Sequence, residues 1–310
     1  MITTVSLNPA IDKTILLSSM DRGSVNRIEG AREDIGGKGI NVAKVLNRLG
    51  IETQICGFIG SANKQRVEEL IAHEHLEYHF LEVDGLTRTN TKIVELEAGL
   101  TTDLNEQGFF VQEDKLNQLK ELMKDRATGC HFTVFSGSIP KGLPDSIYKE
   151  LILEGTKDTK AVLDADGELL VEGIKASPYM IKPNLHELET AFGVVLESDD
   201  SIIQFCKELI ETYQIRLILV SMGENGALLI TEDECYYASP LKIVVKSTVG
   251  AGDSMVAGFI AGYLEDGSYG KAFQMGVCTG SASAFSEELA TKAEVIALLD
   301  SNKKLFAGEQ

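Results

Sequence analysis

Strand-like and helix-like segments alternate along most of the chain, and this alternation constrains the fold more than any other feature. Runs rich in β-branched residues occur at 131–137, 160–165 and 215–223, whereas apolar residues recur at helical spacing in 144–155 and 200–213. Repeated strand-then-helix order is typical of a parallel sheet whose two faces are covered by helices. The sequence therefore predicts an α/β fold with a mainly parallel central sheet.

Two strand-rich segments interrupt this order, at about 10–34 and 87–107. One physical solution is that they pair with each other as a small sheet. Open α/β sheets bind ligands beyond the carboxyl ends of their strands, so such a sheet would form a lid over the site. We therefore expect a main α/β domain made of 1–9, 35–86 and 108–310, with the other two segments as its lid.

The size and charge of the chain limit the possible functions. A chain of 310 residues can hold one large α/β domain with a small appendage. Its net charge of −18 argues against nucleic acid or an anionic membrane surface as a partner. The amino terminus carries no basic-then-apolar leader, and no uncharged run reaches membrane-spanning length. The five cysteines are scattered, which favours reduced thiols and a cytoplasmic location.

A glycine-rich loop, GAGD at 250–253, stands between an extended pattern at 241–249 and an apolar helical pattern at 255–264. Unpaired amides and the dipole at a helix start favour an anion, and glycines let the backbone approach it closely. A carboxylate at this place would repel phosphate unless it receives the proton of an attacking hydroxyl. Asp253 is therefore a candidate base, and a helix N-cap is the alternative.

A second glycine-rich segment, GGKGIN at 36–41, leads into a helical pattern over 38–49. It is not a P-loop, because the pattern G-x-x-x-x-G-K-[ST] is absent from the chain. It could be a turn that feeds the helix. It could also be a second backbone cradle, in which Lys38 supplies charge and Asn41 binds sugar hydroxyls.

Two further patterns have structural and functional interpretations. Asn184 and Glu187 have the spacing of a capping box, and the same polar groups at a helix start could hold the water shell of Mg²⁺. His75 and His79 stand four residues apart, but no third ligand follows them, so we expect no metal site there.

Seven motifs, in order between residues 8 and 262, resemble one protein family. They are NPAID, GGKGINVAKVLNRLG, TRTNTK, FSGSIPKGLP, KPNLHE, SMGENGA and STVGAGDSMVAGF. The set is similar to the ribokinase-like (PfkB-type) carbohydrate kinases, in particular the branch of 1-phosphofructokinases and tagatose-6-phosphate kinases. The resemblance implies a three-layer α/β/α fold with a small β-sheet lid that closes over the sugar. It also implies a homodimer formed through the lid.

The resemblance assigns roles to individual residues. Asp253 would accept the proton of the attacking sugar hydroxyl, and the amides of Gly250, Ala251 and Gly252 would stabilise the transferring phosphoryl group of ATP. The positions that match the family's sugar-binding residues are Asp12, Gly37, Lys38, Asn41, Arg88 and Ser136, of which Arg88 and Ser136 would contact the sugar phosphate. The nucleotide-side positions are Lys182, Asn184, Ser221, Gly223, Gly226, Thr248 and Ser281. Glu187 matches the position linked to Mg²⁺.

The sugar substrate is not fixed by these motifs. Fructose 1-phosphate, phosphorylated at O6, and tagatose 6-phosphate, phosphorylated at O1, fit the same branch. The segment 87–109 looks more like the 1-phosphofructokinases, which favours fructose 1-phosphate. A non-catalytic sugar-phosphate-binding protein is a more distant alternative. A dinucleotide-dependent oxidoreductase is disfavoured, because Met255 stands where its fingerprint needs a third glycine. The segment 280–291 does not decide whether the chain binds potassium.

Overall fold

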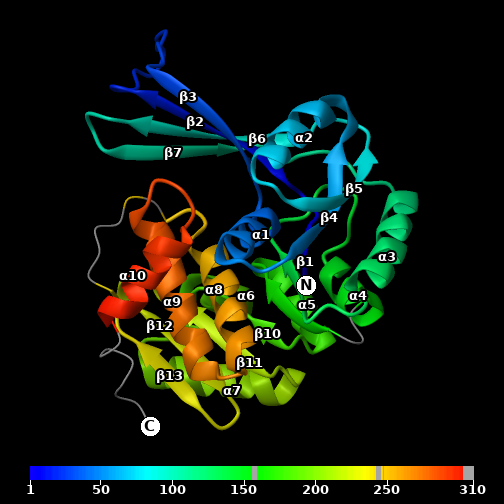
Figure 1. Ribbon diagram of the computed structural model, residues 1–310, viewed down its shortest axis with the longest axis vertical. Coiled ribbons are helices and arrows are strands. Elements are labelled where there is room, and N and C mark those ends of the chain that lie inside the picture. Colours follow the sequence, from blue (N-terminus) through cyan, green and yellow to red (C-terminus); the bar gives the residue numbers. More distant parts are fainter. Residues whose placement is uncertain (156–158, 242–245, 247, 303–310) are drawn as a thin grey trace.

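The computed structural model describes residues 1–155, 159–241, 246 and 248–302. Within them, nine strands form one central sheet (Figure 1): β1 Ile2–Ser6, β4 Thr53–Gly60, β5 Glu77–Val83, β8 Phe132–Ser136, β9 Lys160–Asp164, β10 Met180–Ile181, β11 Leu217–Ser221, β12 Ala227–Thr231 and β13 Cys235–Ala238. The strand order is β13-β12-β11-β10-β9-β8-β1-β4-β5. Strands β5 to β11 in this order run parallel, and β12 and β13 are antiparallel at one edge. The predicted mainly parallel sheet is confirmed.

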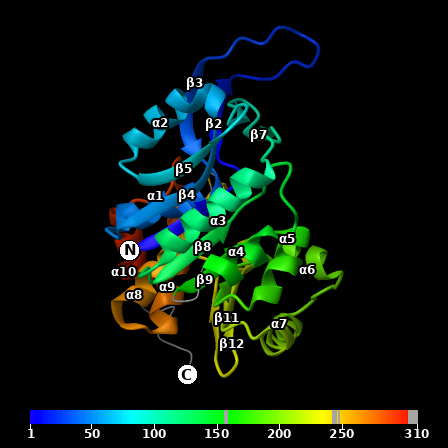
Figure 2. The ribbon, with the colours of Figure 1, turned by 90° about the vertical axis from the view of Figure 1, so that its right-hand side faces the viewer.

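Helices cover both faces of the sheet (Figure 2). They are α1 Lys38–Leu49, α2 Lys64–His73, α3 Glu113–Ala127, α4 Ile147–Gly155, α5 Gly167–Gly173, α6 Leu185–Phe192, α7 Asp199–Tyr213, α8 Ala251–Asp266, α9 Tyr269–Phe285 and α10 Lys292–Asn302. Helices α1, α8 and α9 pack on one face, and α3 to α7 pack on the other. In β11, Leu217 and Leu219 point to the first face, whereas Ile218 and Val220 point to the second, as the alternation of side chains along a strand requires.

A second, smaller sheet projects from the large domain (Figure 1). It consists of β2 Ala10–Leu17, β3 Gly30–Gly36, β6 Arg88–Glu95 and β7 Leu100–Asn105 in the order β3-β2-β6-β7. The two strand-rich segments therefore do pair, through parallel β2 and β6. The first segment, at about 10–34, contains β2 and most of β3, which begins at Gly30. We call this sheet the lid.

The boundaries agree with the sequence where apolar periodicity is strong and differ where glycines occur. Helix α1 has the predicted bounds. Helix α8 begins at Ala251, four residues before the apolar run that predicted it. The extended segment expected at 241–249 lies mostly outside the described residues. Among the helices of the described chain, none combines the length and the hydropathy that a bilayer span needs.

Candidate active site

The amino terminus of α8 presents backbone amides to a cavity. Gly250 is the N-cap residue, with a left-handed φ of 76°, and no side chain caps the helix. The first amides of a helix have no intrahelical acceptor, and together with the helix dipole they favour an anion. The predicted anion hole at 250–252 lies at this helix start, where the amide of Ala251 donates to the backbone oxygen of Thr248 at 3.4 Å, and its binding of an anion stays a prediction. Because Gly250 occupies the N-cap position, the alternative of Asp253 as the cap does not apply.

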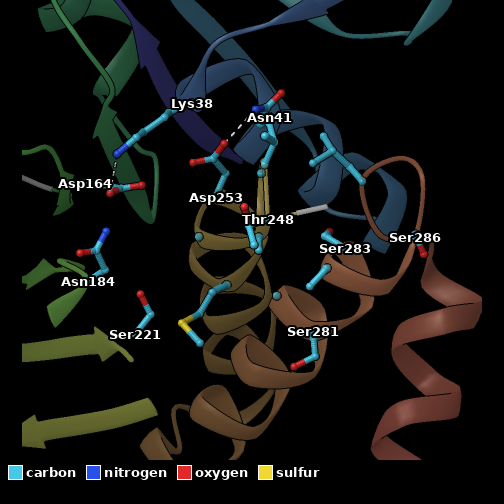
Figure 3. A pocket seen from close by; sticks show the side chains of 18 of the residues that line it. Lys38, Asn41, Asp164, Asn184, Ser221, Thr248, Asp253, Ser281, Ser283 and Ser286 are labelled. Atoms are coloured by element: carbon cyan, nitrogen blue, oxygen red, sulfur yellow. Dashed lines mark hydrogen bonds and ion pairs between the residues drawn. The ribbon is translucent and has the colours of Figure 1, made fainter. Parts of the chain in front are cut away.

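Asp253 lies in the first turn of α8 and is 5% exposed. Its Oδ2 accepts a hydrogen bond of 2.8 Å from Nδ2 of Asn41 on α1 (Figure 3). Burial and then the negative charge of Asp164 raise the pKa of Asp253 to about 6, although Asn41 and Lys38 act in the opposite direction. A carboxylate with such a pKa is ionised at neutral pH and accepts a proton more readily than an ordinary aspartate.

Two lysines share a buried carboxylate beside this base. Nζ of Lys38 and Nζ of Lys182 each lie 3.4 Å from Oδ1 of Asp164, which is fully buried. Burial alone would raise the pKa of Asp164, but Lys182 and Lys38 outweigh it and lower that pKa. Nζ of Lys182 also lies 3.1 Å from where a Cβ on Gly252 would be. The glycine therefore lets an ammonium group reach the start of α8.

Asp164 is a site residue that the sequence analysis did not identify. It stands at the carboxyl end of β9, inside a segment recognised only as a strand. The sequence did contain a feature that could have identified it, because an aspartate at the carboxyl end of a predicted parallel strand lies at the ligand-binding edge of the sheet.

Asn184 and Glu187 form the predicted capping box at the start of α6. The amide of Glu187 donates to Oδ1 of Asn184, and the amide of Asn184 donates to Oε2 of Glu187, both at 2.8 Å. The other carboxylate oxygen of Glu187, Oε1, lies 3.9 Å from Nζ of Lys38. Within the described residues there is no cluster of three or more acidic, histidine or cysteine side chains suited to a metal. The link between Glu187 and Mg²⁺ stays a prediction.

The lid contributes Asp12 from β2. Its Oδ1 accepts a hydrogen bond of 3.0 Å from Nδ2 of Asn90, which stands beside it in register on β6. Burial raises the pKa of Asp12, and Asn90 opposes this effect. A Cβ on Gly36 would lie only 1.8 Å from Oδ2 of Asp12. The absence of a side chain at residue 36 thus makes room for the carboxylate.

The two residues predicted to contact the sugar phosphate, Arg88 and Ser136, differ in whether they line the cavity. The guanidinium of Arg88 donates to the backbone oxygens of Glu106 and Asn8, at 3.2 and 3.1 Å, and to Oγ of Ser138 at 3.2 Å. Ser136 is 2% exposed and does not line the cavity, and within the described chain its Oγ has no hydrogen-bond partner. The contact of Ser136 with a sugar phosphate therefore stays a prediction, and Ser138 is the hydroxyl beside Arg88.

A single cavity of about 1120 Å³ collects the other predicted residues between the lid and the carboxyl ends of the sheet. Figure 3 shows Asp253, Asn41 and Thr248 near its centre, Lys38, Asp164, Asn184 and Ser221 on one side, and Ser281 on the other. Gly223 and Gly226 also line this cavity, beside the turn that follows β11. The arrangement places the carboxylate of Asp253, the start of α8 and two ammonium groups on one open cavity.

Comparison with known proteins identifies what this arrangement resembles. The family model for pfkB family carbohydrate kinases matches residues 5–295. A 1-phosphofructokinase of Bacillus subtilis is 38% identical over 301 residues, which are 96% of this chain and 97% of that protein. A 1-phosphofructokinase of Xanthomonas campestris is 36% identical and covers 91% of this chain and 89% of its own. The structure of phosphofructokinase-2 from Escherichia coli with substrates and products has a TM-score of 0.89 at 26% identity, with coverage of 99% and 98%. The resemblance seen in the seven motifs is confirmed.

Proposed function

The chain belongs to the pfkB family of carbohydrate kinases, and on this basis we propose that it transfers the γ-phosphoryl group of ATP to O6 of fructose 1-phosphate. The product is fructose 1,6-bisphosphate. The observation that carries the proposal is the carboxylate of Asp253, which is buried in the first turn of α8 and lines the same cavity as residues of the lid.

Each group near Asp253 has a part in the transfer. Asp253 accepts the proton of the C6 hydroxyl as its oxygen attacks the γ-phosphorus, and Asn41 holds the carboxylate in place through their 2.8 Å hydrogen bond. The amides of 250–252 stabilise the charge on the transferring group. Lys38 and Lys182 add positive charge beside it, and Asp164 orients both ammonium groups.

The donor set suits a magnesium ion that keeps most of its ligands from water and phosphate. Glu187 has one carboxylate oxygen outside its capping box, and Mg²⁺ in such sites is bound by one or two carboxylates. When bound, the ion neutralises phosphate charge. Glu187 would hold it, directly or through water.

The sugar phosphate lies under the lid. Asp12, fixed by Asn90, binds a hydroxyl, and Arg88 binds the existing phosphate as a charge-assisted pair. Tagatose 6-phosphate presents its phosphate and its free hydroxymethyl at the opposite ends of the ring, so the same site could hold it reversed. The two sugars differ in configuration at C4, and a site that pairs one hydroxyl rejects its mismatch.

The test is kcat/KM for fructose 1-phosphate, tagatose 6-phosphate and fructose 6-phosphate, with product identified by chromatography. The proposal expects fructose 1-phosphate to be preferred. A preference for tagatose 6-phosphate of more than about tenfold, which is ~1.4 kcal/mol in transition-state binding, would show that tagatose 6-phosphate is the substrate instead. Binding of sugar phosphate without any ADP release would instead support a non-catalytic binding protein.

A homodimer formed through the lid is part of the proposal. Strand β7 is exposed along its whole length. Its Asp103 and Asn105 face the cavity, while Leu100 and Leu104 stand on the opposite face and are 58% and 54% exposed. Apolar residues on the outside of an edge strand favour pairing with another surface, and we infer that this surface is the lid of a second copy.

A cytoplasmic location also belongs to the proposal. Cys56, Cys206 and Cys278 are buried thiols, which suits a reducing compartment. The proposed substrates, ATP and a sugar phosphate, are small charged molecules that cells retain inside the membrane, which favours the same location.

A further inference from the structure

The loop at 286–290, between α9 and α10, lies against the anion hole. Cδ2 of Leu289 is 2.3 Å from where a Cβ on Gly250 would be, so the leucine packs directly on the N-cap of α8. The amide of Ala290 donates to Oγ of Ser283 at 2.8 Å, and that oxygen lies 2.6 Å from Oγ of Ser254 on α8. The position of this loop and the position of the helix start are therefore linked.

Two arginines hold the outer side of the same loop. Nη1 of Arg48, on α1, donates to the backbone oxygen of Leu289 at 2.6 Å. Arg32, on lid strand β3, donates through Nη2 to the backbone oxygen of Glu287 at 3.1 Å and through Nη1 to Oε1 of Glu288 at 3.5 Å. Arg48 joins the loop to the large domain, whereas Arg32 joins it to the lid.

The strand register explains why Arg32 can make this bridge. Arg32 stands opposite Thr14, and Asp34 stands opposite Asp12, so the arginine shares the cavity face of the lid with the sugar-side carboxylate. Nε of Arg32 lies 3.3 Å from Oδ2 of Asp34, which orients the guanidinium. Glu33 points to the other face of the lid, where its Oε2 pairs with Nη2 of Arg66 on α2 at 3.0 Å.

We propose that Arg32 is a positioning residue that fixes the lid and the anion hole in one arrangement. Through Glu287 it ties β3, and with it Asp12, to loop 286–290. Through Leu289 the loop then supports Gly250. The distance between Asp12, on the sugar side of the cavity, and Gly250, on the phosphoryl side, is thereby fixed. This inference rests on the proposed kinase function.

Loss of this tie has a specific chemical consequence. A lid that separates from loop 286–290 admits water to the cavity. Water can then attack the γ-phosphorus in place of the sugar hydroxyl. The bond from phosphorus to the ADP oxygen breaks, a bond to the water oxygen forms, and inorganic phosphate and a proton are released. A merely structural arginine would not change the ratio of this hydrolysis to sugar phosphorylation.

The test compares Arg32→Ala with two matched variants in the full-length protein. Arg66→Ala removes another arginine that ties the lid to the large domain but does not touch the loop. Glu288→Ala removes an exposed ion pair and leaves the bond of Arg32 to the Glu287 oxygen. For each we would measure kcat and KM for the sugar phosphate, and inorganic phosphate released per sugar bisphosphate formed.

Arg32→Ala should lower kcat/KM for the sugar phosphate by about tenfold, equivalent to ~1.4 kcal/mol, and raise the phosphate-to-bisphosphate ratio at least ~fivefold. Arg66→Ala and Glu288→Ala should stay within about twofold of the parent, since exposed ion pairs contribute little. Equal behaviour of Arg32→Ala and Arg66→Ala, or an unchanged ratio, would overturn the proposal.

Hydrogen exchange in the ligand-free protein gives a readout that does not depend on activity. Arg32→Ala should speed exchange of amides in 286–290 and at the start of α8, and Arg66→Ala should not. Unchanged exchange in these segments of Arg32→Ala would show that Arg32 does not hold loop 286–290 in place. If the parent protein forms no sugar bisphosphate, the kinase function fails, and the exchange comparison still decides whether Arg32 holds the loop.

Discussion

At the scale of single residues, the protonation of Asp253 controls the proposed chemistry. A base must be deprotonated to act, and burial places the pKa of this carboxyl at about 6. We therefore expect kcat to fall as the pH is lowered through about 6. Asn41 lowers the pKa of Asp253, so Asn41→Ala should move this acidic limb to higher pH.

The control for this prediction is the comparison of the parent protein with Asn41→Ala. A sugar phosphate also titrates at pH ~6, but its titration is the same in assays of both proteins and cannot shift one acidic limb relative to the other. Measurement of kcat at saturating substrates from pH 5 to 8 decides the matter. Coincident acidic limbs in the parent and in Asn41→Ala would show that Asp253 is not the titrating group.

Glu187 tests whether the capping box also organises magnesium. Glu187→Gln keeps the capping hydrogen bond, since a capping box accepts Gln at this position, but it removes the negative charge. We expect a higher magnesium concentration for half-maximal rate, with the melting temperature little changed. An unchanged magnesium dependence, measured by titration at fixed ATP, would leave Glu187 with a structural role only.

At the scale of elements, strand β3 determines how Asp12 is presented. Gly36→Ala would place a Cβ against the Asp12 carboxylate and force it to move. The KM for the sugar phosphate should therefore rise severalfold, while ATP affinity stays unchanged. Gly30→Ala on the same strand is the control, because its Cβ would make only an ordinary 3.6 Å contact with Leu16. Steady-state kinetics in which both variants show the same KM would contradict this role.

The elements differ in how far the sequence could predict them. Helix α1 has a clear apolar stripe and an ordinary glycine stop at Gly50, and its bounds were predicted correctly. Helix α8 starts in a glycine-rich turn that has low helix propensity. It is stabilised by packing on α9, where a Cβ on Gly258 would lie 2.4 Å from Oγ1 of Thr279. Such contacts between distant segments leave no local signal, so the start of α8 was misplaced.

The candidate site shows the same limit. Motifs identified Asp253, Lys38 and Lys182, but the sequence could not indicate that Asp164 joins the two lysines, because that contact depends on the order of strands in the sheet. The burial of Ser136 away from the cavity lining likewise has no signal in the local sequence.

At the scale of the whole molecule, the lid should carry the subunit contact. Leu104→Glu adds a charge to the outer face of β7, so it should shift the protein toward monomers. Leu153→Glu, on α4 and equally exposed at 54%, should leave the assembly unchanged. Sedimentation velocity at several concentrations distinguishes the two. A Leu104→Glu protein that sediments like the parent would place the contact elsewhere.

The central claim is that this molecule moves a phosphoryl group onto a sugar phosphate with Asp253 as the base. The most direct measurement is phosphorus NMR of fructose 1-phosphate and ATP incubated with the parent protein or with Asp253→Asn. The account predicts fructose 1,6-bisphosphate and ADP with the parent, a rate lower by about 10²–10⁴-fold with the variant, and unchanged ATP binding in both. Absence of the bisphosphate with the folded parent, or a near-parent rate with Asp253→Asn, would contradict it.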